Sequence, residues 1–288
     1  MTSLIEYLVG IILILYLAIF AFKREALTEG GTLTAIAIGL LVFLFPSQPY
    51  SGKIWISLLA VFFISSYFVS KLNTKDKLEV NREFAKGSKR DLMQVFANGA
   101  VAALIAVIYG FNPLDSLFMA FCVVLATVNA DTWSTELGVL SRQKPFLITT
   151  FKRVERGISG AVSLLGIAAA AAGSLVIALA AVLFIYLDSI YGGPVFAVPL
   201  GSVEFILFIV IFGTIGALID SLLGATVQVM YYCKKCKKET ERVEHKCGRK
   251  TQFYKGLKWF DNDVVNLVSS LAAGAVAFIV FVILNGFV

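Results

Sequence analysis

Eight apolar blocks most strongly limit what this chain can fold into. A helix that crosses the hydrocarbon layer of a bilayer needs roughly 20 mainly apolar residues. The 288 residues of the chain are 58% apolar and only 15% charged. The blocks cover about 4–22, 32–46, 54–72, 92–110, 115–131, 159–187, 203–230 and 263–286. We therefore expect an all-α, polytopic transmembrane helical bundle with about eight spans. The second block has only 15 residues, so seven spans are the alternative.

The positions of the basic residues predict the orientation of these spans. All of the 25 Lys and Arg residues except Lys53 lie in alternate segments between the blocks. These segments are 23–31, 71–91, 132–158 and 231–262. The positive-inside rule assigns them to the cytoplasm. Eight spans then place both the N-terminus and the C-terminus outside.

This topology also limits the expected partners. We expect one membrane domain over residues 1–288, with a cytoplasmic Cys/His insertion at about 231–258 and the functional groups on the cytoplasmic face. The net charge of +6 is explained by the topology and by attraction to anionic membrane lipids. Nucleic acid is therefore not an expected partner. The sequence leaves open whether the chain forms a homo-oligomer.

The fifth block ends in groups that suit a metal ion. The stretch "ATVNADTWSTELG", residues 126–138, contains Asn129, Asp131 and Glu136. An acidic residue within or at the edge of a span is costly, and it is by default a functional candidate. Asp131 and Glu136 are about 140° apart on an ideal helix, so we expect both to reach one ion only if the helix ends or bends between them. The alternative is that the helix stops at Ala130 and that both acids are solvated.

The segment "PFLITTFKRVERGISGAVSLLG", residues 145–166, has the composition of an anion site. Hydroxyls, basic side chains and glycines precede an apolar helix, which we expect to start at about Ile158. Glycines let backbone N–H groups approach an anion, and a helix N-terminus favours negative charge. The alternative is an ordinary basic loop with a serine cap. The chain has no G-x-x-x-x-G-K-[ST] motif, so it is not a P-loop enzyme. The candidates are Thr149, Lys152, Arg153, Gly157, Ser159 and Gly160.

A polar stripe enters the fourth span. Arg90, Gln94 and Asn98 are four residues apart, which places them on one helix face, and Lys89 precedes them. Such groups bind ligands or join helices by hydrogen bonds. Lys89 and Arg90 are equally consistent with anchors at the membrane surface.

The last two spans also carry polar groups. Asp220 lies well inside the seventh span, which holds no basic residue to pair with it, so it is a functional candidate. Asn262, Asp263 and Asn266 begin the last span near the cytoplasmic border. A ligand or metal site is one interpretation of these three residues, and a helix cap is the alternative for Asn262.

The loop before the last span predicts a zinc site. It contains the only His of the chain and three of its four Cys, with the spacing Cys233-x2-Cys236-x8-His245-x-Cys247. Sets of three cysteines and one histidine bind Zn²⁺ tetrahedrally, and four protein ligands leave no open position, so the predicted Zn²⁺ is structural. The alternative is a group of free thiols in a basic, reducing loop.

Several stretches occur in the same order as in one known family. They include "QVFANG", "NADTWSTELG", "IDSLLGATVQ", the Cys/His motif and "NDVVN". Over about residues 23–275 the chain resembles a family of multi-pass membrane proteins, long filed as a domain of unknown function, that includes the plant phytyl-phosphate kinase of tocopherol synthesis. More distantly it is similar to the dolichol kinase and phosphatidate cytidylyltransferase group, which uses CTP. The chain departs from the family pattern at Ile158 and Ala161, and Phe151 stands where glycine is common.

The resemblance implies a CTP-dependent kinase that converts an isoprenoid monophosphate, of the phytyl or geranylgeranyl phosphate type, to the diphosphate. It assigns catalytic motifs to Asp131, Glu136, Lys152 and Asp220. Phosphoryl transfer needs positioning and charge neutralisation, so we expect Mg²⁺ at Asp131, Glu136, Asp220 and Asp263. The expected nucleotide- and phosphate-binding residues are Lys89, Arg90, Asn98, Asn129, Thr149, Arg153, Gly157, Ser159, Gly160, Asn262 and Asn266.

Two other functions remain as alternatives. A CTP-dependent lipid cytidylyltransferase needs the same nucleotide site but releases pyrophosphate instead of CDP. An ion-coupled membrane transporter would use the acid within the span. A transporter predicts acids near the middle of the bilayer and polar groups on both sides, whereas here the polar groups gather toward one side.

Overall fold

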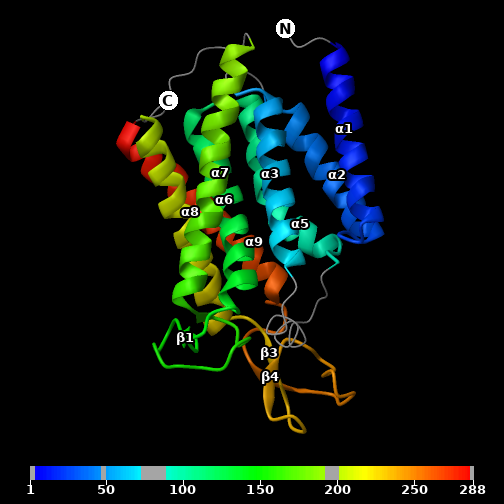
Figure 1. The fold of residues 1–288 in the computed structure, drawn as a ribbon, viewed down its shortest axis with the longest axis vertical. Helices are drawn as coiled ribbons and strands as arrows, with labels where there is room; N and C mark the ends of the chain where they lie inside the picture. The colour runs from blue at the N-terminus through cyan, green and yellow to red at the C-terminus, as the bar shows by residue number, and fades with distance from the viewer. Residues whose placement is uncertain (1–3, 47–49, 73–88, 192–200, 286–288) are drawn as a thin grey trace.

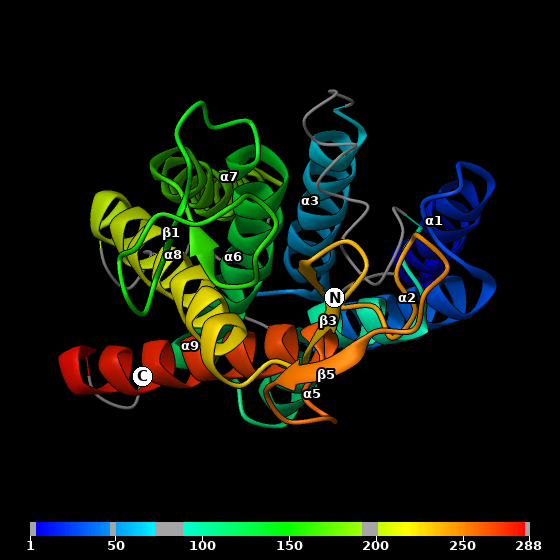
Figure 2. The same ribbon diagram turned by 90° about the horizontal axis from the view of Figure 1, so that it is seen from below.

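Helices account for most of the chain. The computed structural model describes residues 4–46, 50–72, 89–191 and 201–285. In these ranges eight helices form a bundle, which the last helix crosses obliquely (Figures 1 and 2). They are α1 (Leu4–Lys23), α2 (Glu29–Leu44), α3 (Gly52–Lys71), α5 (Leu92–Phe111), α6 (Asp115–Gly138), α7 (Leu164–Ile190), α8 (Ser202–Thr226) and α9 (Asn262–Asn285).

The predicted all-α polytopic fold is confirmed. Seven of the eight helices in the described ranges are long and apolar enough to cross a membrane. The eighth is α2, which has 16 residues and packs against α1, α3 and α5. The block that is short in the sequence is therefore also the short helix in the structure.

Helix α6 is the centre of the bundle. It packs against α3, α5, α7, α8 and α9, and every residue from Ser116 to Ala130 is buried. At one end of α6, Phe118 stacks on Tyr50 with ring centroids 4.0 Å apart, and Trp55 packs against Phe121 at 4.3 Å. Burial of such large aromatic side chains stabilises the contact of α6 with its neighbours. The other end of α6 leaves the core and carries Asp131 and Glu136.

The two ends of the bundle differ in structure. The segments 139–163 and 227–261 lie at the lower end in Figure 1, while the first residues of α1 and the last residues of α9 lie at the upper end. The lower end holds β1 (Phe146–Leu147) paired with β2 (Ala161–Val162), and a three-stranded antiparallel sheet of β3 (Met230–Cys233), β4 (Lys238–Thr240) and β5 (Gln252–Lys255). In that sheet the strand order is β4-β3-β5. Figure 2 shows this end from below. We call it the basic end, because it carries most of the described Lys and Arg residues.

Three helix boundaries differ from those expected. Helix α6 continues to Gly138, so the alternative that it stops at Ala130 is wrong. Helix α7 begins at Leu164 and not near Ile158, because Gly157 and Gly160 have positive φ and Ala161–Val162 pairs as β2 with β1. The Ser163 hydroxyl then caps α7 by accepting a hydrogen bond from the backbone N–H of Gly166.

The expected end of the seventh span at residue 230 is also wrong. Helix α8 ends at Thr226, and the backbone N–H of Val229 donates to the carbonyl of Phe260 at 2.8 Å. Strand β3 begins at the next residue, Met230. Once the backbone is paired across the sheet it cannot continue the helical ladder.

Candidate functional site: an acidic cavity at the basic end

One cavity of about 390 Å³ gathers the predicted acids. It lies at the basic end, between the ends of α6, α8 and α9 and the turn that precedes α7. All four expected metal ligands line it, namely Asp131, Glu136, Asp220 and Asp263. The other predicted site residues that line it are Arg90, Asn98, Gly157, Ser159, Gly160 and Asn262. Five segments of the chain, namely the start of α5, the end of α6, the turn before α7, the end of α8 and the start of α9, therefore share one cavity.

Asp131 and Glu136 reach the cavity from an unbroken helix. Because α6 continues to Gly138, these residues stay about 140° apart around its axis. The cavity therefore extends around the end of α6, and no bend is needed to bring both residues to it. The carboxylate of Asp131 forms no hydrogen bond or ion pair with any other residue in the described ranges. A charge so placed favours a bound cation.

Asp220 reaches the cavity from α8 and is hydrogen-bonded to α9. It is buried, and its Oδ2 accepts a hydrogen bond of 2.9 Å from the Ser269 hydroxyl of α9. The negative charges of Asp131 and Asp220 act on each other unfavourably. Two neighbouring carboxylates within the membrane-spanning part of a bundle are stabilised together when a cation lies between them.

The turn before α7 closes another side of the cavity. Gly160 has φ of +77°, and an added Cβ there would overlap Ala225 near the end of α8, so only glycine fits this position. The Ser159 hydroxyl donates to Oε1 of Gln228 at 2.6 Å, and Nε2 of Gln228 donates to Oε1 of Glu241 at 2.9 Å. This chain of hydrogen bonds joins the turn to the sheet at the wall of the cavity.

Two arginines bring positive charge to the acids. Arg90 is half-buried, with its guanidinium 5.9 Å from the ring centroids of both Phe62 and Phe63. Burial lowers the pKa of the Arg90 guanidinium from its ordinary value, and the Glu136 carboxylate opposes that shift. Arg156 also lines the cavity, and its guanidinium donates to the carbonyl of Ser141.

Asn129 does not line the cavity. It is fully buried two residues from Asp131, and its Oδ1 accepts from the hydroxyls of Ser65 and Ser66 at 2.9 and 3.1 Å. Its Nδ2 donates to the carbonyl of Gly173 at 2.8 Å. Asn129 therefore holds α3, α6 and α7 together, as polar groups between membrane helices often do.

Five other predicted residues also lie outside the cavity wall. Thr149, Lys152 and Arg153 are exposed in the segment between β1 and β2. Lys89 is exposed, with its ammonium 5.9 Å from the ring of Phe22. Asn266 reaches the site indirectly, since its Nδ2 donates to Oδ1 of Asn98 at 3.2 Å.

Several residues that were not predicted as site residues also line the cavity, among them Arg156, Gln228 and Glu241. Arg156 lies only three residues from Arg153, and the sequence gives no sign of which of the two faces the acids. Gln228 lies two residues after the end of α8, and Glu241 directly follows β4. Only the spacing of four residues from Asp220 to Gly224 to Gln228 pointed toward Gln228. Nothing in the sequence pointed to Glu241.

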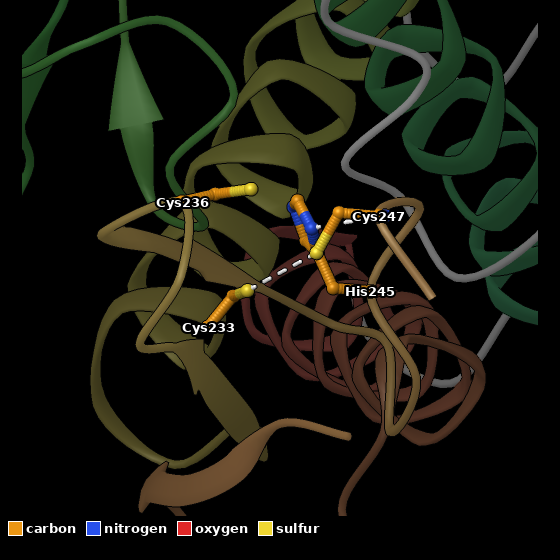
Figure 3. Close-up of side chains that lie close together, drawn as sticks. All are labelled: Cys233, Cys236, His245 and Cys247. Atoms are coloured by element: carbon orange, nitrogen blue, oxygen red, sulfur yellow. Dashed lines mark hydrogen bonds between the residues drawn. The ribbon is translucent and has the colours of Figure 1, made fainter. Parts of the chain in front are cut away.

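The Cys/His residues form a compact cluster in the sheet. Their ligand atoms all lie within 4.8 Å of one another, and Figure 3 shows the four side chains converging from two turns. The Sγ atoms of Cys233 and Cys247 are 3.7 Å apart. Two sulfurs bound tetrahedrally to one zinc at 2.3 Å lie about 3.8 Å apart, while a disulfide needs about 2.05 Å. The donor set and its spacing therefore fit Zn²⁺.

The thiols of the cluster influence one another. A hydrogen bond with the His245 side chain lowers the pKa of the Cys247 thiol to about 6, although desolvation opposes the shift. A hydrogen bond with Cys247 raises the pKa of the Cys236 thiol to about 11. Because zinc binds the thiolate form of cysteine, Cys247 is ready to bind, whereas Cys236 must release its proton when the metal binds.

The sheet that carries the cluster is attached to the acidic cavity. The Lys255 ammonium of β5 donates to the carbonyl of Ala225 at 3.0 Å, at the end of the helix that carries Asp220. The bond between Gln228 and Glu241 is the second link. The cluster therefore stabilises a unit that forms one wall of the cavity.

These features define a class: a multi-pass helical membrane protein with an acidic, arginine-lined cavity at its basic end. The chain belongs to the family described as integral membrane protein DUF92, whose model matches residues 12–274. It is 31% identical to Protein PGR of Arabidopsis thaliana, over 88% of this chain and 89% of that protein.

Two further relatives extend the comparison. The uncharacterized membrane protein MJ0933 of Methanocaldococcus jannaschii is 32% identical, over 78% of this chain and 84% of that protein. Protein VTE6, chloroplastic, of Arabidopsis thaliana is 27% identical, over 91% of this chain and 68% of that protein. No solved structure matches the chain.

Proposed function

We propose that this protein is a CTP- and Mg²⁺-dependent kinase that converts an isoprenoid monophosphate to the diphosphate at the cytoplasmic face of the membrane. The observation that carries the proposal is the single cavity at the basic end, where Asp131, Glu136, Asp220 and Asp263 meet Arg90 and Arg156. The resemblance to the family of the plant phytyl-phosphate kinase supplies the substrate class and the nucleotide. The cavity supports it because phosphoryl transfer depends on charge neutralisation and positioning more than on covalent chemistry.

The acids supply the expected metal ligands. Mg²⁺ is usually held by one or two carboxylates together with waters and substrate phosphates. Asp131 and Asp220 suit the direct contacts, since both line the cavity and the Asp131 carboxylate forms no hydrogen bond or ion pair in the described ranges. Bound there, Mg²⁺ would neutralise charge on the transferred phosphoryl group. Glu136 and Asp263 line the same cavity and suit contacts through water.

The remaining groups orient the two phosphate substrates. Arg90 and Arg156 neutralise phosphate charge, and a guanidinium binds phosphate with two parallel hydrogen bonds. The glycine turn from Gly157 to Gly160 brings backbone N–H groups to the cavity wall. An oxygen of the lipid phosphate attacks the terminal phosphorus of CTP, the bond to CDP breaks, and CDP leaves. Since that oxygen is already ionised near neutral pH, no strong general base is required.

The experiment follows both products of the reaction. Protein purified in detergent is mixed with geranylgeranyl phosphate, MgCl₂ and CTP labelled in its terminal phosphate. We expect labelled geranylgeranyl diphosphate and unlabelled CDP. Asp220→Asn should abolish both, whereas the matched change Asp188→Asn, in α7 but away from the cavity, should abolish neither. Unchanged turnover in Asp220→Asn contradicts the assignment.

The same assay tests the second enzyme function. A cytidylyltransferase would release pyrophosphate and transfer the cytidine monophosphate group to the lipid. The cavity suits either reaction, because both need a metal-bound nucleoside triphosphate next to a lipid phosphate. Release of pyrophosphate instead of CDP would replace the kinase proposal with this one.

We also propose that Cys233, Cys236, His245 and Cys247 hold a structural Zn²⁺. The support is the compact four-ligand geometry, with all ligand atoms within 4.8 Å. A zinc with four protein ligands has no position for substrate. Its expected role is to hold the sheet, and with it Glu241, against the cavity.

A further inference from the structure

A second cavity, of about 190 Å³, lies beside the first and is almost entirely apolar. We call it the apolar groove, and helices α1, α2, α3 and α5 form its walls. Its lining residues are apolar or glycine with three exceptions, Ser57, Arg90 and Asn98. Arg90 and Asn98 also line the acidic cavity. The two cavities therefore meet at these two side chains.

The groove has the length of a hydrocarbon chain within one leaflet. Along α1 it extends from Gly10 to Ala21, which is about 16 Å at 1.5 Å per residue. That is roughly half of the 30 Å hydrocarbon layer. Leu13 and Leu17 line the groove but remain exposed on the bundle surface, so it opens toward the membrane. A lipid in the bilayer can enter it sideways.

Arg90 lies where the apolar groove meets the acidic cavity, a position that suits the charged headgroup of a lipid. Its backbone N–H donates to the carbonyl of Ala26 at 2.9 Å, and its carbonyl accepts from Thr28 at 3.0 Å. The backbone is thus fixed between α1 and α2. Among described residues the guanidinium has the rings of Phe62 and Phe63 as neighbours but no hydrogen-bonded or ion-paired acid. A half-buried guanidinium in this state favours an anionic ligand.

We propose that the apolar groove holds the hydrocarbon chain of a lipid monophosphate whose phosphate lies against Arg90 and Asn98. The inference rests on the proposed function for the identity of that lipid, but its geometry is independent of the nucleotide. The continuity of the two cavities and the positive charge at their junction specify a long single chain with an anionic head. In this arrangement the phosphate faces the acidic cavity, where the second phosphate would be added.

Binding measured without nucleotide tests the groove separately from catalysis. The full-length protein in detergent is titrated with geranylgeranyl phosphate, with geranyl phosphate and with inorganic phosphate, and bound ligand is measured by native mass spectrometry. We expect the affinity to fall at least about tenfold from the 20-carbon to the 10-carbon phosphate, because fewer methylene groups are buried. Inorganic phosphate should bind most weakly of the three.

A substitution that fills the groove gives the decisive comparison. Ser57 lines the groove from α3 and is half-buried. It lies six residues from Phe63, about 9 Å along the helix, and is therefore far from the headgroup end. We expect Ser57→Phe to weaken binding of geranylgeranyl phosphate about tenfold, or 1.4 kcal/mol, while binding of geranyl phosphate changes little. Ala172→Phe, on the exposed surface of α7, is the matched control and should change neither. Equal weakening of both ligands, or no effect of Ser57→Phe, would overturn the proposal.

The headgroup is tested at Arg90. Arg90→Gln should weaken binding of geranylgeranyl phosphate but not of geranylgeraniol, which has no charge.

Should a variant fail to fold, the wild-type protein can be labelled with a geranylgeranyl phosphate that carries a diazirine at the chain end. Labelled peptides from α1 and α3 support the groove, and labelling confined to α7, α8 or α9 would overturn it. If the protein binds the 20-carbon phosphate more tightly than the 10-carbon phosphate but does not phosphorylate it, only the proposed kinase activity is rejected. If it phosphorylates the lipid but binds both chain lengths equally, only the proposed groove is rejected.

Discussion

The two candidate metal sites of this protein are built in opposite ways. The Cys/His cluster comes from 15 consecutive residues, and its four ligand atoms lie within 4.8 Å. The acids of the cavity come from α6, α8 and α9, and the only close group of three or more such ligands in the described ranges is the Cys/His cluster. The first is a closed site that folding completes. The second is open, and it needs a ligand to complete it.

The difference agrees with the preferences of the two proposed ions. Zinc takes four soft ligands in a fixed tetrahedron, which a short segment with two turns can supply. Magnesium keeps several waters and binds substrate phosphates, so a protein leaves room around it. A site that stabilises structure is complete without substrate. A catalytic site must keep positions open, at the cost of uncompensated charge.

The largest expected effect separates activity from stability. Asp131→Asn should lower the rate of phosphoryl transfer about 10²- to 10³-fold. It should also raise the free energy of unfolding by about 1 kcal/mol, because it removes a charge that has no partner in the described ranges. Turnover of labelled CTP and thermal unfolding in detergent measure the two quantities. Loss of both activity and stability would mean that Asp131 is structural, and the contrast between the two sites would fail.

Loss of a ligand from the Cys/His cluster should lower stability, whereas Asp131→Asn should raise it. Cys247→Ser should reduce the zinc content from about one per chain to near zero and open the sheet. Because residues 230–255 carry many Lys and Arg side chains, we expect trypsin to cut this unit about 100-fold faster. Cys122→Ala, which removes the cysteine in α6, should leave zinc content unchanged. Full zinc content in Cys247→Ser would reject the ligand assignment.

Acid should release the zinc. The folded-state pKa of the Cys247 thiol, about 6, lies below that of a free thiol. Its contribution is therefore fully present above the free-thiol value and is lost as the pH falls through about 6. We expect the rate of zinc transfer to a chromogenic chelator to rise as the pH is lowered from 7.5 to 5.5. A rate that is independent of pH in this range would contradict the assignment of a thiolate ligand.

A smaller loss of activity should follow from a change between the acidic cavity and the sheet that carries the Cys/His cluster. Gln228→Ala removes both hydrogen bonds that join Ser159 to Glu241. We expect kcat/KM to fall about tenfold, equivalent to about 1.4 kcal/mol, with zinc content unchanged. Gln143→Ala, in an exposed turn, is the matched control. An unchanged kcat/KM would show that the sheet does not position the cavity.

The smallest effect concerns a residue that departs from the family pattern. Phe151 is exposed and has φ of +55°, a conformation that is unfavourable for side chains other than glycine. Phe151→Gly removes about 1–2 kcal/mol of strain and also the stacking of Phe151 on Phe146, whose ring centroids are 5.9 Å apart. Because Phe151 is exposed, we expect the relieved strain to exceed the lost stacking, with a net stabilisation of about 1 kcal/mol and unchanged activity. Thr150→Gly, whose φ is not positive, should instead destabilise it slightly. A loss of stability in Phe151→Gly would contradict the inference that the backbone of Phe151 is strained.

Polar residues that are close in the sequence show how far the sequence could predict which side chains line the cavity. Asn129 and Asp131 are two residues apart on the same helix, and both are polar groups in an apolar block. Only Asp131 faces the cavity, while Asn129 joins three helices. Two residues along a helix turn a side chain by about 200°, so the side that each residue faces depends on how α6 is rotated in the bundle. Arg153 and Arg156 lie outside any helix, and the path of the segment between β1 and β2 decides that only Arg156 lines the cavity.

The sequence by itself determined the membrane-spanning helices, the concentration of basic residues in alternate segments and the clustering of Cys and His. These properties are local, because the transfer of an apolar block from water to lipid depends mainly on its own composition. The tertiary structure decided which acids share a cavity, where α7 begins, and that an apolar groove meets the cavity at Arg90. Those features depend on pairing and packing between different segments, such as β1 with β2 and α6 with α8 and α9. A pattern along one segment does not contain the rotation and spacing of its neighbours.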